Sequence, residues 1–242
     1  MNERGSLAPG TRIDGRYRIV EQLGEGGMGV VYRARDERLG RPVALKTLAA
    51  SRVGDEQARV RLLREARAAA ALDHPGIAKV YDVGATDDGG AYLVMELVRG
   101  TSLREAMSRL SRERALRLLE ELAAALDHAH ANGVIHRDVK PDNVMVRDDG
   151  RAVLLDFGLA KDVGIAMAET VAPDTPTEHA DFATKEGTLV GTLSYLAPEQ
   201  ARGRGVSPES DQFALATTAY EMLFGRLPWE GNNTAAVLAQ IL

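Results

Sequence analysis

Hydrophobic and polar residues alternate over several short stretches in the first part of the chain. These stretches are rich in β-branched and aromatic residues, which favour β-strands. They predict five strands, at residues 17–20, 30–34, 42–48, 78–83 and 91–97. Glycine-rich segments separate the first three strands, and the turn Asp87-Asp88-Gly89-Gly90 joins the last two.

The hydrophobic period changes between the third and fourth strands. Over residues 55–72, Val60, Leu63, Ala66 and Ala70 recur at helical spacing, with charged residues between them. The segment Asp73-His74-Pro75-Gly76 then provides a strong stop signal. The order β-β-β-α-β-β predicts a small antiparallel sheet with one helix packed on it.

The remainder of the chain is predicted to be mainly helical. Ser102 and Glu105 form a capping box for a helix that includes Leu110. Residues 112–132 form an amphipathic helix, and residues 207–223 are apolar nearly all round, so that helix should be buried. Short strands are expected at residues 134–135, 144–146 and 153–155. Residues 162–190 show no periodicity, which is typical of a functional or disordered segment.

Composition narrows the class of protein without naming a function. The chain has 242 residues, 45% of them apolar and 27% charged, as in an ordinary globular protein. The net charge of −5 provides no basic footprint for nucleic acid. There is no long apolar run for a bilayer, no secretory signal and no cysteine. We therefore expect a cytoplasmic protein with no nucleic-acid partner and no membrane segment in this chain.

A glycine-rich stretch lies between the first two predicted strands. It reads Gly24-Glu25-Gly26-Gly27-Met28-Gly29, a G-x-G-x-x-G pattern. A dinucleotide-binding fingerprint would require a helix directly after the glycines, whereas a strand follows here. The stretch therefore indicates a hairpin whose backbone can approach a ligand closely and cover phosphates. A plain hairpin turn remains the alternative on this motif alone.

Lys46 lies on the third predicted strand, and Ala44 faces the same side of it. A small residue beside a cation suits a nucleotide, whose base needs room and whose phosphates need positive charge. Glu65 on the following helix could hold the Lys46 ammonium in place. The alternatives are a solvated strand lysine and, because Arg64 and Arg67 are neighbours, a glutamate on an exposed face.

The sharpest signal is the loop His136-Arg137-Asp138-Val139-Lys140-Pro141-Asp142-Asn143, followed later by Asp156-Phe157-Gly158. Asp138 can accept a proton from an incoming hydroxyl, and Lys140 can neutralise a phosphoryl group. Asn143 and Asp156 offer oxygen ligands suited to Mg²⁺. Positioning and charge neutralisation are what phosphoryl transfer requires, so the combination favours that chemistry.

With these motifs in order, and with Ala197-Pro198-Glu199 after them, the chain resembles the eukaryotic-like (Hanks-type) bacterial Ser/Thr protein kinases from about Tyr17 to Leu242. The resemblance implies an α+β, two-lobed kinase fold. It divides the chain into a flexible leader (1–14), an N-lobe (15–97) and a C-lobe (98–242) with an activation segment (156–199). Family members continue through further helices, so we expect the C-lobe to be incomplete and the arginine partner of Glu199 to be absent.

The resemblance also assigns roles at an ATP site. Lys46 contacts the α- and β-phosphates and pairs with Glu65. The glycine-rich loop that covers the nucleotide comprises Leu23, Gly24, Glu25, Gly26, Gly27, Met28 and Gly29. Met95 limits the space behind the adenine, and the backbone of residues 96–98 forms the hinge. The residues expected to contact the adenine are thus Val31, Ala44, Met95, Glu96, Val98 and Met145.

Further roles concern the reaction and its substrate. Asp138 is the expected catalytic base, Lys140 assists at the γ-phosphate, and Asn143 and Asp156 hold Mg²⁺. Asp211 anchors the backbone of the catalytic loop, and Phe157 stacks near His136. Lys140 two residues after Asp138, and Thr192 near the substrate hydroxyl, are typical of the Ser/Thr class.

Regulation is expected in the activation segment. In kinases of this pattern Arg137 binds a phosphate on that segment, and a phosphothreonine can order it through arginine pairs. The candidates are Thr184 and Thr188, followed by Thr170, Thr175 and Thr177, for which a merely polar loop is the preferred explanation. A second copy of the chain is a candidate partner, for autophosphorylation in trans.

The leading hypothesis is an Mg²⁺/ATP-dependent kinase that phosphorylates Ser and Thr of a protein substrate. The alternative is a catalytically impaired, nucleotide-binding scaffold of kinase-like fold. A dinucleotide-dependent oxidoreductase is excluded because no βαβ unit surrounds the glycines. A small-molecule phosphotransferase is not expected to carry Arg137 together with Ala197-Pro198-Glu199.

Overall fold

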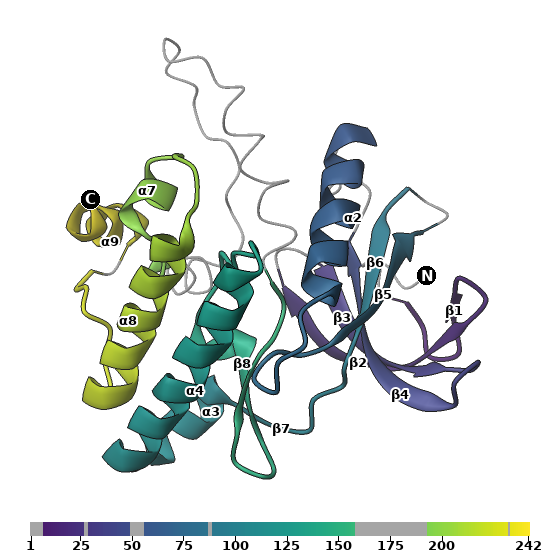
Figure 1. The fold of residues 1–242 in the computed structure, drawn as a ribbon, viewed down its shortest axis with the longest axis horizontal. Helices are drawn as coiled ribbons and strands as arrows, with labels where there is room; N and C mark the ends of the chain where they lie inside the picture. The colour runs from purple at the N-terminus through teal and green to yellow at the C-terminus, as the bar shows by residue number, and fades with distance from the viewer. Residues whose placement is uncertain (1–6, 27–28, 49–55, 87–88, 158–192, 232) are drawn as a thin grey trace. The chain divides into compact units, whose positions relative to one another are not determined.

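The computed structural model describes residues 7–26, 29–48, 56–86, 89–157, 193–231 and 233–242 (Figure 1). The described residues form two compact units. The first contains the chain up to Asp73 together with Ala78–Arg99, and the second contains His74–Ile77 and the described residues from Gly100 onward. No helix in the described part is both long and apolar enough to cross a membrane.

The described residues of the first unit form a six-stranded antiparallel sheet and one helix (Figure 1). The strand order is β1-β2-β3-β4-β6-β5. The elements are β1 (Arg12–Ile13), β2 (Tyr17–Gly26), β3 (Gly29–Asp36), β4 (Arg41–Leu48), α2 (Glu56–Ala70), β5 (Val80–Ala85) and β6 (Ala91–Met95). The five strands and the helix expected from the sequence are all present.

The described part of the predicted leader (1–14) is hydrogen-bonded to the sheet. Arg12 and Ile13 form β1 and pair with β2. The Gly10 backbone N–H donates to the Ile19 carbonyl at 2.8 Å, and the Leu7 backbone N–H donates to the Tyr32 hydroxyl at 2.9 Å. These long-range hydrogen bonds fix a segment that has almost no hydrophobic pattern of its own.

Each face of the sheet has its own hydrophobic cluster. One face carries the larger cluster, which comprises Tyr17, Ile19, Tyr32, Ala34, Val43, Leu45, Tyr92 and Val94. The other carries Ala44, Leu93 and Met95, which pack with Ala66 of α2. Successive residues of a strand point to opposite faces. Ala44 and Lys46 therefore belong to the face that α2 covers.

The second unit combines helices with a three-stranded sheet of order β7-β8-β9. Its strands are β7 (Gly100–Ser102), β8 (Val144–Arg147) and β9 (Ala152–Leu154). The α-helices among its described residues are α3 (Leu103–Ala106), α4 (Arg112–Ala131), α7 (Pro198–Ala201), α8 (Pro208–Phe224) and α9 (Thr234–Ile241), with 3₁₀ turns at η1 (Met107–Arg109) and η2 (Pro141–Asn143).

Two local predictions for this unit were wrong. Residues 134–135 form no strand. The α-helix expected to run from Ser102 to Leu110 ends at Ala106, and the 3₁₀ turn η1 follows it directly. The predicted N-cap is present, because the Ser102 hydroxyl accepts a hydrogen bond from the Glu105 backbone N–H at 3.2 Å.

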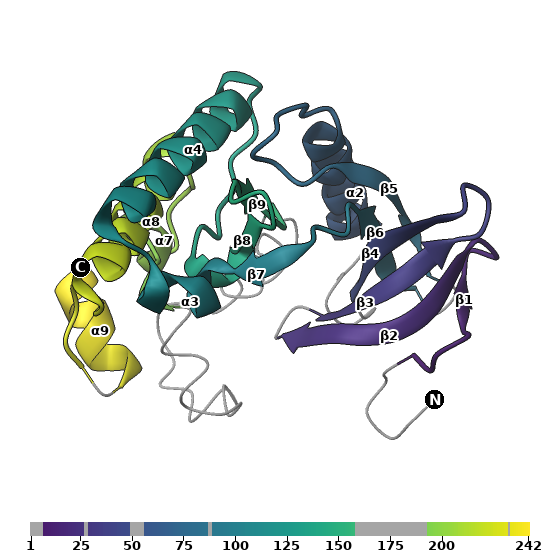
Figure 2. The same cartoon turned by 90° about the horizontal axis from the view of Figure 1, so that it is seen from below.

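Helices α4 and α8 lie side by side (Figure 2). The buried side of α4 includes Leu118, Leu122 and Leu126. On α8 the expectation of an apolar buried surface is only partly met. Its most buried positions include Asp211, Thr217, Thr218 and Glu221, whereas Phe224 is 62% exposed. Polar residues of α8 are thus among its buried positions, and two of them, Asp211 and Glu221, hydrogen-bond residues that are distant in the sequence.

Candidate active site

The glycine-rich hairpin is built by β2 and β3. Gly24 pairs with Val31 and Gly26 pairs with Gly29, while Gly27 and Met28 lie outside the described residues. Gly29 has a φ of +150°, and a Cβ there would stand 1.9 Å from the carbonyl oxygen of Thr47. At Gly24, in contrast, a Cβ would meet no described atom within 4 Å. The close approach of the Thr47 carbonyl therefore requires glycine at position 29, whereas a side chain at position 24 would have space.

The predicted nucleotide-binding residues of β3, β4 and β6 share one face of the sheet. Val31 pairs with Lys46, and Ala44 pairs with Met95. By strand alternation these four side chains lie on the face that also carries Leu93 and Ala66. Ala44 and Met95 are buried and Lys46 is partly exposed. This face of the sheet thus has a small apolar surface formed by Val31, Ala44 and Met95, with the ammonium group of Lys46 beside it.

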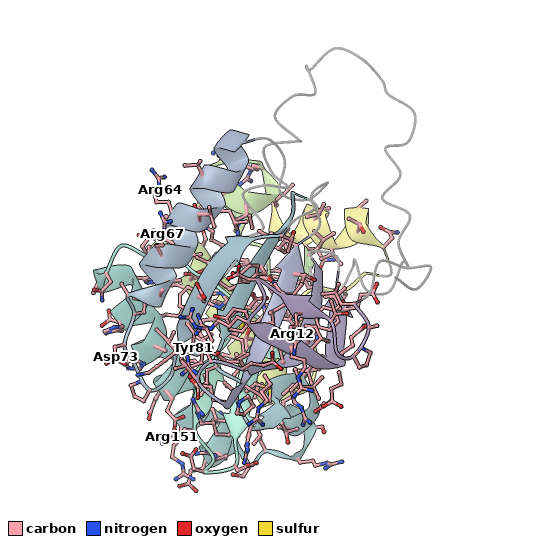
Figure 3. All side chains as sticks on the ribbon, turned by 90° about the vertical axis from the view of Figure 1, so that its right-hand side faces the viewer. Arg12, Arg64, Arg67, Asp73, Tyr81 and Arg151 are labelled. Atoms are coloured by element: carbon pink, nitrogen blue, oxygen red, sulfur yellow. The ribbon has the colours of Figure 1, made fainter. Side chains whose placement is uncertain are left out.

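Glu65 precedes Ala66 on α2, the helix that packs against this face. Glu65 is half-buried, whereas Arg64 and Arg67 are exposed (Figure 3). The alternative of a glutamate on an exposed helix face is therefore disfavoured. The predicted pair of Lys46 with Glu65 remains a proposal.

The predicted hinge directly follows β6. The Glu96 backbone N–H donates to the Lys79 carbonyl at 2.8 Å, which ties this end of β6 to the start of β5. Residues 96–98 have no regular secondary structure and are partly exposed. Leu97 packs on the Ala44 cluster. The backbone of Glu96 and Val98 is thus held beside the same face as Lys46.

The predicted catalytic loop lies in the second unit and forms a compact set of polar contacts. Lys140 Nζ is 3.1 Å from Asp138 Oδ2. The Asn143 side-chain amide donates to the Asp138 carbonyl at 2.8 Å and to Asp138 Oδ2 at 2.9 Å. Three residues that the sequence singled out are therefore brought together around one carboxylate.

Asp211 of α8 supports the backbone of this loop. Its Oδ2 accepts the His136 backbone N–H at 2.7 Å, and its Oδ1 accepts the Arg137 backbone N–H at 2.7 Å. His130 Nε2 lies 2.8 Å from Oδ2 as well. The carboxylate is 1% exposed, so these hydrogen bonds are made away from solvent. Arg137 has a φ of 68°, a left-handed conformation that such contacts must hold in place.

Asp156 and Phe157 follow β9. Asp156 also has a left-handed φ, of 56°, which is uncommon for a residue other than glycine. The Phe157 ring is buried against His136, with 4.8 Å between ring centroids. His136 Nε2 donates to the Leu155 carbonyl at 2.8 Å, and its Nδ1 accepts the Asp138 backbone N–H at 3.3 Å. The His136 ring therefore links the catalytic loop to the segment that carries Asp156.

Met145 lies on β8, where it pairs with Ser102 and Val153. Its side chain is partly exposed, in the strand that begins directly after Asn143. Met145, the predicted adenine contact, therefore lies two residues after Asn143, the predicted metal ligand, in the second unit.

The segment around Ala197-Pro198-Glu199 packs against the same loop. Gln200 Nε2 donates to the Arg137 carbonyl at 3.3 Å, and Trp229 Nε1 donates to the Ser194 carbonyl at 2.7 Å. The Glu199 carboxylate accepts a hydrogen bond from the Ser210 hydroxyl. Glu199 thus has a hydrogen-bond partner within the described residues.

Three residues of this region were not predicted from the sequence. Arg104 of α3, Tyr195 and Glu221 of α8 form a polar network with Asp142 of the catalytic loop. Glu221 stands among apolar residues of α8, but the sequence indicated no partner for it. Of the other predicted residues, Gly158, Thr184, Thr188 and Thr192 lie outside the described residues.

Comparison with known proteins adds a family to this geometry. Residues 17–242 match the model of the protein kinase domain. The chain is 42% identical over 235 residues to serine/threonine-protein kinase PknA of Mycobacterium tuberculosis, covering 94% of this chain and 51% of PknA. It is 38% identical over 231 residues to serine/threonine-protein kinase PrkC of Bacillus subtilis, covering 94% of this chain and 33% of PrkC.

A solved structure supports the same assignment. The crystal structure of the Mycobacterium tuberculosis PknI kinase domain matches with a TM-score of 0.71 and 31% identity, covering 95% of this chain and 82% of that one. The matched region spans 51% of the length of PknA and 33% of the length of PrkC. The ordered motifs, the loop geometry and the match over residues 17–242 lead to one conclusion: this chain belongs to the protein kinase family.

Proposed function

We propose that this chain is the catalytic domain of a Ser/Thr protein kinase that transfers the γ-phosphoryl group of ATP to a protein hydroxyl. The observation that carries the proposal is the convergence of Lys140 and Asn143 on the carboxylate of Asp138. Similarity to PknA and PrkC, both named as serine/threonine-protein kinases, supports the same reaction.

In this proposal Asp138 accepts the proton of the substrate hydroxyl. The Asn143 amide donates a hydrogen bond to one oxygen of the Asp138 carboxylate, and Asp211 accepts hydrogen bonds from the backbone of the loop. Orientation of a base in this way contributes more to phosphoryl transfer than covalent chemistry does. Lys140, 3.1 Å from the same carboxylate, places a positive charge where the transferred group must pass.

Asn143 and Asp156 are the residues that would hold Mg²⁺. The Asn143 amide nitrogen donates within the loop, so its oxygen is the atom suited to a cation. No group of three His, Cys, Asp or Glu side chains within the described residues could hold a metal by itself. Mg²⁺ is usually bound by one or two protein oxygens together with substrate phosphates. When bound, Mg²⁺ neutralises phosphate charge.

The nucleotide half of the proposal rests on the first unit. Val31, Ala44 and Met95 provide an apolar surface for a flat base, and Lys46 on the same face provides a charge for phosphates. The open space at Gly24 allows the hairpin backbone to approach a ligand. Glu65 would hold the Lys46 ammonium in its binding position.

We further propose that activity is raised by autophosphorylation at Thr184 or Thr188, with Arg137 receiving the phosphate and a second copy of the chain acting in trans. Peptide mapping after incubation with ATP and Mg²⁺ should find phosphate on at least one of these residues. Mutation of both to alanine should lower activity. Phosphate on neither residue would refute this part of the proposal.

The function itself is tested by incubating the chain with γ-labelled ATP, Mg²⁺ and a generic protein substrate, followed by phosphoamino-acid analysis. Label should appear on serine and threonine and not on tyrosine. Nucleotide binding with no transfer to any protein would instead favour the kinase-like scaffold.

A further inference from the structure

Gln200 of α7 makes two hydrogen bonds with separate parts of the second unit. Its side-chain Oε1 accepts the Ala197 backbone N–H at 3.0 Å, and its Nε2 donates to the Arg137 carbonyl at 3.3 Å. The two partners have opposite polarity, and an amide side chain offers both an acceptor and a donor on one flat group. Gln200 therefore joins the start of α7 to the catalytic loop.

The Arg137 carbonyl belongs to the peptide group that directly precedes Asp138. The other end of this group is the Asp138 backbone N–H, which donates to His136 Nδ1 at 3.3 Å. His136 lies in the same loop, whereas Gln200 belongs to a separate helix. Because a peptide group is planar, a hydrogen bond to its carbonyl also fixes the direction in which the chain enters Asp138.

Arg137 is held on both sides of its Cα atom. Its φ of 68° is left-handed, and an arginine keeps such a conformation only where its surroundings enforce it. Asp211 accepts the Arg137 N–H at 2.7 Å and so fixes the peptide group before Arg137, while Gln200 fixes the peptide group after it. Together the two contacts restrain both backbone torsions of Arg137.

The two anchors of Arg137 are themselves connected. Glu199, next to Gln200, accepts a hydrogen bond from the Ser210 hydroxyl, and Ser210 directly precedes Asp211 in α8. Ala197, the N-cap residue of α7, is fully buried, so Gln200 satisfies a backbone N–H that water does not reach. The support of the catalytic loop thus extends through Gln200 to α7 and α8.

We propose that Gln200 is a positioning residue for phosphoryl transfer. Through the Arg137 carbonyl it sets the orientation of the peptide group before Asp138, and with it the direction of the carboxylate that accepts the substrate proton. The inference rests on the proposed kinase function. Misplacement of a reacting group by about 1 Å can cost about 10²-fold in rate, so a contact this close to the base should affect kcat.

Two substitutions separate this role from the capping of α7. Gln200→Glu keeps an oxygen for the Ala197 N–H but loses the NH₂ donor, and its second oxygen is repelled by the Arg137 carbonyl oxygen. Gln200→Met has a similar length and offers no strong donor or acceptor. The hydrogen bond to Arg137 is lost in both variants, whereas the cap of α7 is lost only in Gln200→Met.

The test measures kcat, the KM for ATP and the urea midpoint of each variant. With a generic protein substrate, kcat should fall by about tenfold or more in both variants, while the KM for ATP stays within about twofold. The urea midpoint should fall by about 0.5 M in Gln200→Met alone, because only there does a buried N–H lose its acceptor. Wild-type kcat in Gln200→Glu, or an equal fall of the urea midpoint in both variants, would overturn the proposal.

Gln240→Glu is the matched control for the loss of a side-chain donor. Gln240 of α9 also bonds both backbone groups of one residue, since its Oε1 accepts the Glu230 N–H at 3.1 Å and its Nε2 donates to the Glu230 carbonyl. Glu230 lies outside the catalytic loop, so Gln240→Glu should leave kcat unchanged. A fall of kcat in Gln240→Glu as large as that in Gln200→Glu would contradict a specific role of Gln200.

Amide hydrogen exchange of the peptide that spans residues 136–143 tests the loop itself, without any measurement of activity. Exchange should be about tenfold faster in Gln200→Glu than in the wild type, as expected for a lost hydrogen bond. Unchanged exchange would overturn the proposal. If the wild-type chain transfers no phosphate, the proposed function fails, whereas exchange of the loop still decides this inference. If Gln200→Met does not fold, kcat and exchange of Gln200→Glu decide it.

Discussion

Replacement of Asp211 by asparagine should weaken both the fold and the catalytic loop. The Asp211 carboxylate is 1% exposed and accepts backbone N–H groups of His136 and Arg137, each at 2.7 Å. In Asp211→Asn one oxygen becomes an NH₂ group, which faces a backbone N–H donor. A buried donor without an acceptor costs about 1–3 kcal/mol, and loss of a charge-assisted hydrogen bond adds a similar amount.

We therefore expect the free energy of unfolding of Asp211→Asn to fall by about 3 kcal/mol, measured by urea denaturation. Phosphoryl transfer should fall as well, because Arg137 would no longer be held in its left-handed conformation, with φ at 68°. Glu209→Gln is the matched control. It removes an exposed carboxylate from the same first turn of α8 and should change both quantities far less.

Asp211→Ala extends the same test by removing every acceptor at this position. It should be less stable than Asp211→Asn, because the N–H groups of both His136 and Arg137 then lack their partner. Equal stability of Asp211→Asn and Glu209→Gln would contradict the reasoning. It would mean that the hydrogen bonds to the loop backbone contribute no net stability.

Two further predictions concern the first unit. Gly29→Ala should lower the free energy of unfolding by about 1–3 kcal/mol, because its Cβ would collide with the Thr47 carbonyl. Gly24→Ala should leave stability nearly unchanged but raise the KM for ATP, and equal destabilisation of both variants by urea would contradict this. Asp36 accepts a hydrogen bond from Arg16, which lowers its pKa from 3.8 to about 2. The stability that this pair contributes is present above about pH 4 and is lost as the pH falls toward 2, so the difference in unfolding free energy between wild type and Asp36→Asn should shrink over that window. A pH-independent difference would contradict the assignment.

The fold of the first unit could be predicted well because each strand carries its own alternating pattern. The helix period of α2 and the glycine-rich turn were equally local signals. Strand β1 was missed because Arg12 and Ile13 offer two residues and no pattern, and hydrogen bonds from Gly10 and Leu7 to β2 and β3 fix that segment. Long-range pairing of this kind leaves no trace in a short polar stretch.

The candidate site could be predicted where residues are close in the sequence. The contacts of Asp138 with Lys140 and Asn143 are local in the sequence, so the spacing of this loop contained much of the information. The network of Arg104, Tyr195 and Glu221 could not be predicted, because it joins three separate elements. The buried side of α8 was also misjudged. Asp211 and Glu221 on that side are hydrogen-bonded by residues far away in the sequence, and the apolar pattern hid that role.

Phosphoryl transfer by Asp138→Asn, beside the wild type, tests the central claim most directly. The assay measures the rate at which γ-labelled phosphate reaches a generic protein substrate. Asp149→Asn is the matched control, because Asp149 is an exposed aspartate in the nearby turn after β8 that pairs with Arg151 at 2.7 Å. The account predicts a fall of about 10²- to 10⁴-fold for Asp138→Asn, retained nucleotide binding, and near wild-type transfer for Asp149→Asn. Equal labelling by Asp138→Asn and the wild type would contradict it.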